Sequence, residues 1–134
     1  MTPPTERAAK AEFDRWADAG RAESMAHGHL GVTEAAIRTW RVDHNSTVLD
    51  VGCGNGWAVQ SLVDRGAGKG RGVDISDRMI ERARAATLND ERFLFNVAAA
   101  DRLPYENDSV SHILNVESLY YYPSPQRALH EWAR

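Results

Sequence analysis

The sequence predicts an α/β protein built on an open, doubly wound parallel sheet of about four strands, with cap helices at the N-terminus. Two observations support this prediction. From residue 47 onward, short apolar runs alternate with segments whose apolar residues recur at helical spacing, and this alternation is typical of βαβ units. A glycine-rich turn also follows the first apolar run directly, as expected where a parallel strand passes into a helix near a ligand.

Composition and charge narrow the function. The chain has 134 residues, of which 43% are hydrophobic and 26% charged, close to the average of folded domains. A formal net charge of −3 argues against nucleic acid and a membrane surface as partners, because both attract basic faces. We find neither a secretory signal nor a membrane span in the sequence. The single cysteine, Cys53, excludes an intrachain disulfide and fits a reducing, cytoplasmic location.

Residues 1–44 are predicted to form an N-terminal helical cap. Apolar residues between positions 5 and 20 recur at helical spacing, which predicts one amphipathic helix. A second, short helix is expected to begin near Thr33, which is a good N-cap. We interpret Phe13 and Trp16 of the first helix as core residues.

Residues 45–134 are predicted to hold the sheet. Strands are expected at residues 47–51, 70–75, 92–97 and 110–116. Helices are expected at residues 57–64 and 76–86, and Ser124 followed by Pro125 opens a last helix, with serine as N-cap and proline at the first helical position.

The predicted sheet has fewer strands than such sheets usually have, so we expect this second domain to be incomplete at its C-terminus. The fourth strand would then present unpaired backbone groups at an edge, and such an edge invites pairing with another chain. The sequence therefore predicts self-association through the fourth strand.

The turn after the first strand is the most informative segment. Gly52, Gly54 and Gly56 alternate with other residues directly after the strand, so the backbone can turn sharply and approach a ligand closely. In the G-x-G-x-x-G fingerprint of nicotinamide-dinucleotide sites the third glycine would stand at position 57, so Gly56 comes one residue early. Asp50, at the end of the strand, is poorly placed for a pyrophosphate but suits a ligand that carries an ammonium group.

Two further acids follow the next strands. Asp74 ends the second strand, where a carboxylate can accept hydrogen bonds from both hydroxyls of a ribose. Asp101 follows the third strand and can accept a hydrogen bond from an exocyclic amine such as that of adenine. The carboxyl ends of parallel strands share one edge of the sheet, so the three acids are expected to border one crevice.

The run from Val48 to Trp57, with Asp74 and Asp101, resembles the class I S-adenosylmethionine-dependent methyltransferases, in the small-molecule branch similar to ubiquinone and menaquinone biosynthesis methyltransferases. This resemblance covers about residues 45–134 and implies a Rossmann-like sheet in which the first strand lies beside the fourth.

The resemblance also implies S-adenosylmethionine as cofactor and a set of residues around it. Asp50, Gly52, Cys53 and Gly54 would surround the methionine moiety, while Asp74 and the adjacent Ile75 would border the ribose. The remaining implied cofactor residues are Ala100, Asp101 and Arg102 at the adenine and Asn115 at the end of the fourth strand.

The expected reaction is transfer of the sulfonium methyl group to a small-molecule acceptor, with the protein supplying alignment and, where needed, a general base. His29, Glu117 and Tyr120 are the candidate bases, because they fall in segments expected to border the pocket. We interpret Cys53 as a turn residue and not as a nucleophile. His27 and His29 lack a clear third ligand, so we expect no metal site.

Two alternative functions stay open at this point. A nicotinamide-dependent oxidoreductase uses a similar sheet, and the spacing of the glycine turn is the feature that distinguishes it. A non-catalytic remnant that binds the cofactor is the other alternative, because the predicted sheet is incomplete.

Overall fold

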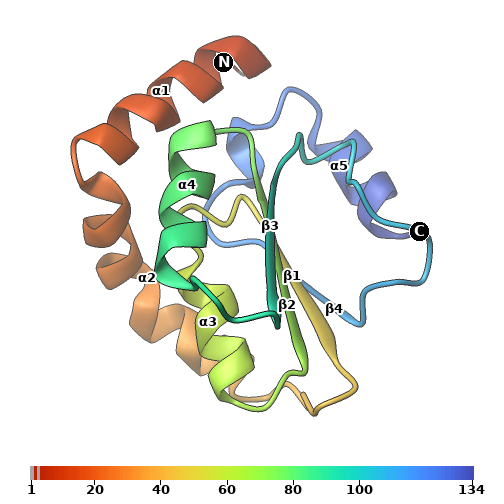
Figure 1. Cartoon of the computed structure of the whole chain (residues 1–134). Coiled ribbons are helices and arrows are strands. Elements are labelled where there is room, and N and C mark those ends of the chain that lie inside the picture. Colours follow the sequence, from red (N-terminus) through yellow and green to blue (C-terminus); the bar gives the residue numbers. More distant parts are fainter. Residues whose placement is uncertain (1, 3) are drawn as a thin grey trace.

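The computed structural model describes residue 2 and residues 4–134. Its sheet has four parallel strands in the order β3-β2-β1-β4, so the first strand lies beside the fourth as expected. Figure 1 shows helices on both faces of this sheet. The predicted fold class is therefore confirmed. The strands are β1 (Thr47–Val51), β2 (Lys69–Asp74), β3 (Phe93–Val97) and β4 (His112–Leu114).

The helices form two layers on one face of the sheet and one on the other. In Figure 1, α3 (Trp57–Asp64) and α4 (Asp77–Ala86) cover one face, while α5 (Pro125–Trp132) lies on the opposite side. The N-terminal helices α1 (Glu6–Asp18) and α2 (Arg21–Ile37) pack outside α4 and α3 respectively. Residues 1 and 3 of the predicted cap lie outside the described residues.

The second N-terminal helix is much longer than predicted. It runs over 17 residues from Arg21, whereas the sequence predicts a short helix that begins near Thr33. Gly28 and Gly31 lie inside it, and each lowers helix propensity by about 1 kcal/mol relative to alanine. Tertiary packing overrides this cost, because the helix buries Ala22, Thr33 and Ile37.

The fourth strand is shorter than predicted. It spans three residues, His112 to Leu114, and its pairing with β1 ends where Asp50 faces Leu114. Beyond that pair, the carbonyl of Val51 accepts hydrogen bonds from side chains. The strands therefore separate at this point, which opens the crevice that doubly wound sheets use for ligands.

The remaining elements agree with the sequence. Ser76 and Ser124 are the N-caps of α4 and α5, since their hydroxyl oxygens accept hydrogen bonds from the N–H groups of Met79 and Arg127. A short 3-10 helix, η1 (Leu119–Tyr121), precedes α5 and was not predicted as an element.

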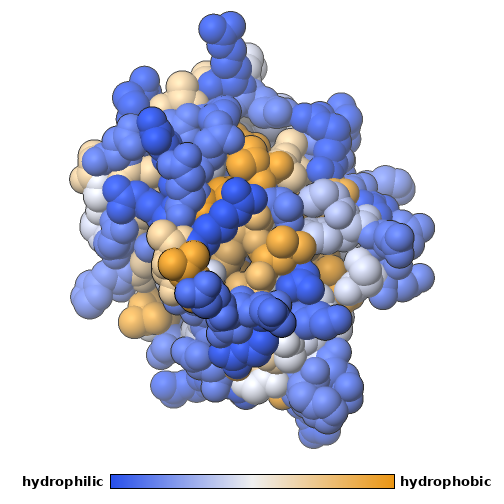
Figure 2. All heavy atoms as spheres, viewed as in Figure 1, coloured by the Kyte–Doolittle hydropathy of each residue, from blue (hydrophilic) through white to orange (hydrophobic). Residues whose placement is uncertain are grey.

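Both outer strands of the described sheet have one edge without a strand partner. Figure 2 shows apolar surface in the middle of the face on which β3 lies. Leu94 and Val97 of this strand are large hydrophobic residues with nearly half of their surface exposed.

Among the described helices, none has the length and apolar character needed to cross a membrane.

Candidate functional site

A cavity of about 330 Å³ lies at the carboxyl end of the sheet. Its size falls in the range of small-molecule sites. Residues that follow β1, β2, β3 and β4 all line it, and α1 and α2 close it from outside. The three acids predicted to share a crevice, Asp50, Asp74 and Asp101, are all in its wall.

Most of the predicted site residues line this cavity. The predicted cofactor residues in the wall are Asp50, Gly52, Cys53, Gly54, Asp74, Ile75, Ala100, Asp101 and Arg102. The three candidate bases, His29, Glu117 and Tyr120, also line it. Asn115 is not among the lining residues, because its amide group points to the carbonyl of Val51.

The glycine turn is held by backbone hydrogen bonds to β2. The N–H groups of Gly52 and Cys53 both donate to the carbonyl of Val73, at 2.8 and 2.9 Å. Gly52, Gly54 and Gly56 all have φ between +53° and +81°, a region that residues with a Cβ adopt only at a cost. This conformation explains why glycine occupies the three positions.

The three glycines face different surroundings. A Cβ at Gly56 would lie 2.8 Å from the ring of Phe95, so this glycine allows close packing in the core. At Gly54 the nearest atom would be the sulphur of Met79 at 3.9 Å, so the surface of the turn is open there. Of the three positions, Gly54 therefore offers the closest backbone approach to a ligand.

Asp50 is buried beneath the turn, with 2% of its surface exposed. Its Oδ1 atom is the one buried side-chain oxygen or nitrogen among the described residues without a hydrogen-bond partner. Burial, and then the negative charge of Asp74, raises the pKa of Asp50 well above its usual range. A cationic ligand group would satisfy this oxygen and stabilise its charged form.

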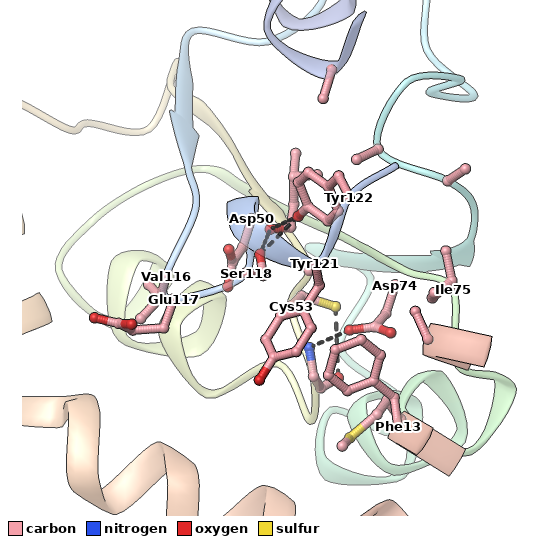
Figure 3. A pocket seen from close by; sticks show the side chains of 18 of the residues that line it. Phe13, Asp50, Cys53, Asp74, Ile75, Val116, Glu117, Ser118, Tyr121 and Tyr122 are labelled. Atoms are coloured by element: carbon pink, nitrogen blue, oxygen red, sulfur yellow. Dashed lines mark hydrogen bonds between the residues drawn. The ribbon is translucent and has the colours of Figure 1, made fainter. Parts of the chain in front are cut away.

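Asp74 lies beside the turn, and its carboxyl group is already hydrogen-bonded. Oδ2 accepts from the N–H of Gly54 at 3.0 Å, and Oδ1 accepts from the N–H of Ser76 at 2.9 Å. Figure 3 shows the carboxyl group beside the turn. Burial raises the pKa of Asp74, while these backbone hydrogen bonds oppose the shift. Each oxygen keeps a second acceptor position for a ligand hydroxyl.

Asp101 marks the other end of the cavity. Its carboxyl group lies 3.4 Å from the guanidinium of Arg102 and 3.3 Å from that of Arg127. Arg102 also pairs with Glu6 at the start of α1. The loop after β3 thus forms ion pairs with both α1 and α5.

Aromatic rings form the outer wall of the cavity. Phe13 and Trp16 of α1 meet Tyr121 of η1 edge to face, with ring centroids 5.1 and 6.2 Å apart, and Figure 3 shows Phe13 close to Tyr121. The interpretation of Phe13 and Trp16 as core residues is therefore incomplete, since both line the cavity. Trp57 and Met25 extend this wall.

The candidate bases differ in chemistry. Glu117 has φ +52°, which is uncommon for a residue other than glycine, and its carboxylate accepts a hydrogen bond from the Tyr120 hydroxyl at 3.4 Å. Desolvation, with smaller contributions from Tyr121 and Glu117, raises the pKa of Tyr120 to about 12. Tyr120 therefore stays protonated at neutral pH, which argues against it as a proton acceptor.

Cys53 does not have the surroundings of a nucleophile. Its side chain is buried, and burial together with the charges of Asp74 and Asp50 raises the pKa of the thiol well above its usual range. The interpretation of Cys53 as a turn residue agrees with this environment.

The sequence did not predict that Ser118 and Tyr122 lie against the turn; Tyr122 was expected only as part of the tyrosine run at residues 120–122, either packed on the core or forming a substrate wall. Their hydroxyl groups lie 3.3 and 3.2 Å from the carbonyl of Val51. The signal available in the sequence was the series of polar residues at positions 115, 118 and 122, directly after the fourth strand.

Comparison with known proteins identifies similar chains. Residues 49–134 match the family described as "Methyltransferase domain". The methyltransferase GfsG of Streptomyces halstedii is 30% identical over 125 residues, which cover 91% of this chain and 45% of the relative. The 27-O-demethylrifamycin SV methyltransferase of Amycolatopsis mediterranei is 27% identical in an alignment that covers 100% of this chain and 56% of the relative.

A solved structure shares the same fold over most of the chain. It is a putative methyltransferase in complex with the Trm112 methyltransferase activator of Haloferax volcanii, with 39% sequence identity and a TM-score of 0.87. The alignment covers 92% of this chain and 54% of that chain. The chain thus spans about half the length of the relatives it matches.

Proposed function

Because this chain belongs to the class I S-adenosylmethionine-dependent methyltransferases, we propose that it binds S-adenosylmethionine in the cavity at the end of β1 and transfers its methyl group to a small-molecule acceptor. The observation that carries the proposal is the buried carboxyl group of Asp50, whose Oδ1 atom has no hydrogen-bond partner. The ammonium group of a methionine moiety would supply that partner.

The other parts of the cofactor have matching surroundings. Gly54 leaves open space beside the turn, where the amino-acid part would lie with Gly52 and Cys53. Asp74 and Ile75 would border the ribose, and Ala100, Asp101 and Arg102 would border the adenine. The cofactor would thus extend from the turn to the loop after β3.

The residues of the chain would orient the acceptor and move its proton. When bound, the cofactor supplies an electrophilic methyl group on a sulfonium sulphur, which no side chain can provide. The aromatic wall of Phe13, Trp16 and Tyr121 would exclude water from the acceptor. Glu117 and His29, both in the cavity wall, are the groups proposed to accept its proton.

Calorimetry with S-adenosylhomocysteine tests the binding part of the proposal. The chain is expected to bind this product and not NADH. Tighter binding of NADH would replace the proposal with the oxidoreductase, which the comparisons do not favour. Methyl transfer is tested with labelled S-adenosylmethionine and a panel of small metabolites. Binding without transfer to any of them would support a non-catalytic domain.

We further infer that a protein partner is a candidate for this chain, supported by the relative that forms a complex with Trm112. Titration with purified Haloferax volcanii Trm112 tests this inference, and a lack of binding at high concentration would exclude that partner.

We also propose that residues 1–44 form a helical cap and that residues 45–134 form the cofactor-binding domain. A cytoplasmic location is supported by the free thiol of Cys53.

A further inference from the structure

The peptide that joins Val51 to Gly52 lies where β1 leaves its neighbour β4. The pairing of β1 with β4 ends at Asp50, so the next carbonyl, that of Val51, has no backbone N–H from β4 to accept. A buried carbonyl without a donor costs free energy. The structure meets this need with side chains that come from the segment after β4.

Three side chains surround this carbonyl. The amide nitrogen of Asn115 lies 2.7 Å from it, and the hydroxyl groups of Ser118 and Tyr122 lie 3.3 and 3.2 Å from it. The three groups also contact one another, at distances between 2.6 and 2.8 Å. Figure 3 shows Ser118 and Tyr122 directed toward each other, with a dashed line marking the hydrogen bond between their hydroxyl groups.

This polar cluster fits directly against Gly52. A Cβ at that position would lie 2.4 Å from the Ser118 hydroxyl and 3.0 Å from the Tyr122 hydroxyl. On the other side, the N–H of Gly52 donates to the carbonyl of Val73 at 2.8 Å. Both polar groups of the Val51–Gly52 peptide are therefore engaged, one by the cluster and one by β2, so the peptide cannot rotate without losing a hydrogen bond.

Tyr122 also connects the turn to the opposite end of the cavity. Its ring meets Trp132 of α5 edge to face at a centroid distance of 6.3 Å. The indole N–H of Trp132 donates to the carbonyl of Ala100 at 2.9 Å. Burial raises the pKa of Tyr122 well above its usual range, so its hydroxyl remains a hydrogen-bond donor at neutral pH.

We propose that Asn115, Ser118 and Tyr122 are positioning residues, which hold the Val51–Gly52 peptide so that the glycine turn and Asp50 face the amino-acid end of the cofactor. The inference rests on the proposed function, because it assigns these residues a role in binding S-adenosylmethionine. They would act through the backbone of the turn and not on the reacting atoms.

The test compares two ligands that differ at the amino-acid end. S-Adenosylhomocysteine carries this part, whereas 5′-methylthioadenosine lacks it and keeps the adenosine. In Ser118→Ala and in Tyr122→Phe, the Kd for S-adenosylhomocysteine is expected to rise roughly two- to tenfold, as for the loss of one hydrogen bond. The Kd for 5′-methylthioadenosine is expected to change much less, because neither variant removes a group that contacts Asp74 or Asp101, and Tyr122→Phe keeps the ring that meets Trp132.

Hydrogen exchange gives a second measurement that needs no ligand. The N–H of Gly52 is expected to exchange faster in both variants, since its peptide is held from one side only. Ser118→Thr keeps the hydroxyl group. This variant is therefore expected to retain both the affinity for S-adenosylhomocysteine and the slow exchange of the Gly52 N–H.

Matched controls are Tyr105→Phe and Ser109→Ala, because each removes a hydroxyl group from a residue outside the cavity wall. Equal weakening of both ligands, or unchanged exchange at Gly52, would overturn the positioning role. If the unaltered chain binds 5′-methylthioadenosine and S-adenosylhomocysteine equally well, the role is likewise excluded. If it binds neither, the proposed function fails instead.

Discussion

At the scale of single residues, the carboxyl group of Asp74 joins the glycine turn to the start of α4. It accepts hydrogen bonds from the N–H groups of Gly54 and Ser76, which fixes both oxygens at the cavity. A ribose would find its acceptor already oriented, so little side-chain entropy would be lost on binding.

Removal of this carboxyl group should therefore weaken cofactor binding. Asp74→Ala is expected to reduce the affinity for S-adenosylhomocysteine by about 1.5 to 3 kcal/mol, the range for hydrogen bonds to a charged group. Calorimetry measures the change. Asp77→Ala is the matched control, since it removes the same charge from an exposed carboxyl group three residues away. Equal affinities of Asp74→Ala and the unaltered chain would mean that the ribose lies elsewhere.

Asp50 should affect stability and binding in opposite directions. Its raised pKa means that the folded chain binds more protons than the unfolded chain at pH values between the ordinary pKa of 3.8 and the raised one. The free energy of unfolding therefore falls as the pH rises through this window. A cationic ligand group at Oδ1 would stabilise the charged form of this carboxyl group, so burial disfavours in the free chain the form that a cationic ligand would favour.

The variant Asp50→Asn tests this interpretation. Its Tm is expected to exceed that of the unaltered protein at pH 7, and the difference should shrink as the pH falls toward 4, where the carboxyl group is neutral. Thermal unfolding followed by circular dichroism at several pH values measures it. Asp18→Asn changes an exposed carboxyl group and serves as control. A Tm difference that is the same at every pH would contradict the role of burial.

At the scale of elements, glycines have opposite effects in the turn and in α2. Gly56 combines φ +81° with ring carbons of Phe95 2.8 Å from a Cβ placed there, whereas Gly28 has open space in a helix. The first position needs glycine, because a side chain would be strained and would overlap the core. At Gly28 a Cβ would meet no other side chain, so glycine there only lowers the helix propensity.

We therefore expect Gly56→Ala to lower the free energy of unfolding by about 2 to 4 kcal/mol, from backbone strain and overpacking together. Gly28→Ala should raise it by up to about 1 kcal/mol, through helix propensity. Urea denaturation measures both. If the two variants changed stability in the same direction, the packing assigned to the turn would be wrong.

At the scale of the whole molecule, the edges of the described sheet determine how the chain meets other chains. β4 pairs with β1 on one side and has no strand partner on the other among the described residues. An edge of this kind offers backbone groups to a further strand.

Self-association through β4 is therefore expected for the chain on its own. Sedimentation velocity over a wide concentration range should show a sedimentation coefficient that increases with concentration, since mass action favours the associated form. A compact monomer at every concentration would contradict the prediction.

Several features of the protein were determined by its sequence alone. The order of strands and helices, the N-caps Ser76 and Ser124, and the acids that follow three successive strands could all be predicted, because they depend on local periodicity, capping and the alternation of a parallel sheet. The glycine turn could also be predicted, because its three glycines adopt the positive φ that glycine favours.

Other features were decided only by the tertiary structure. Asn115 contacts the carbonyl of Val51, which lies 64 positions earlier in the chain. The ring of Phe13, near the N-terminus, contacts Tyr121, near the C-terminus. The full length of α2 likewise depends on packing that outweighs its glycines. No local pattern encodes these contacts, because each arises where the sheet ends and brings distant segments to one cavity.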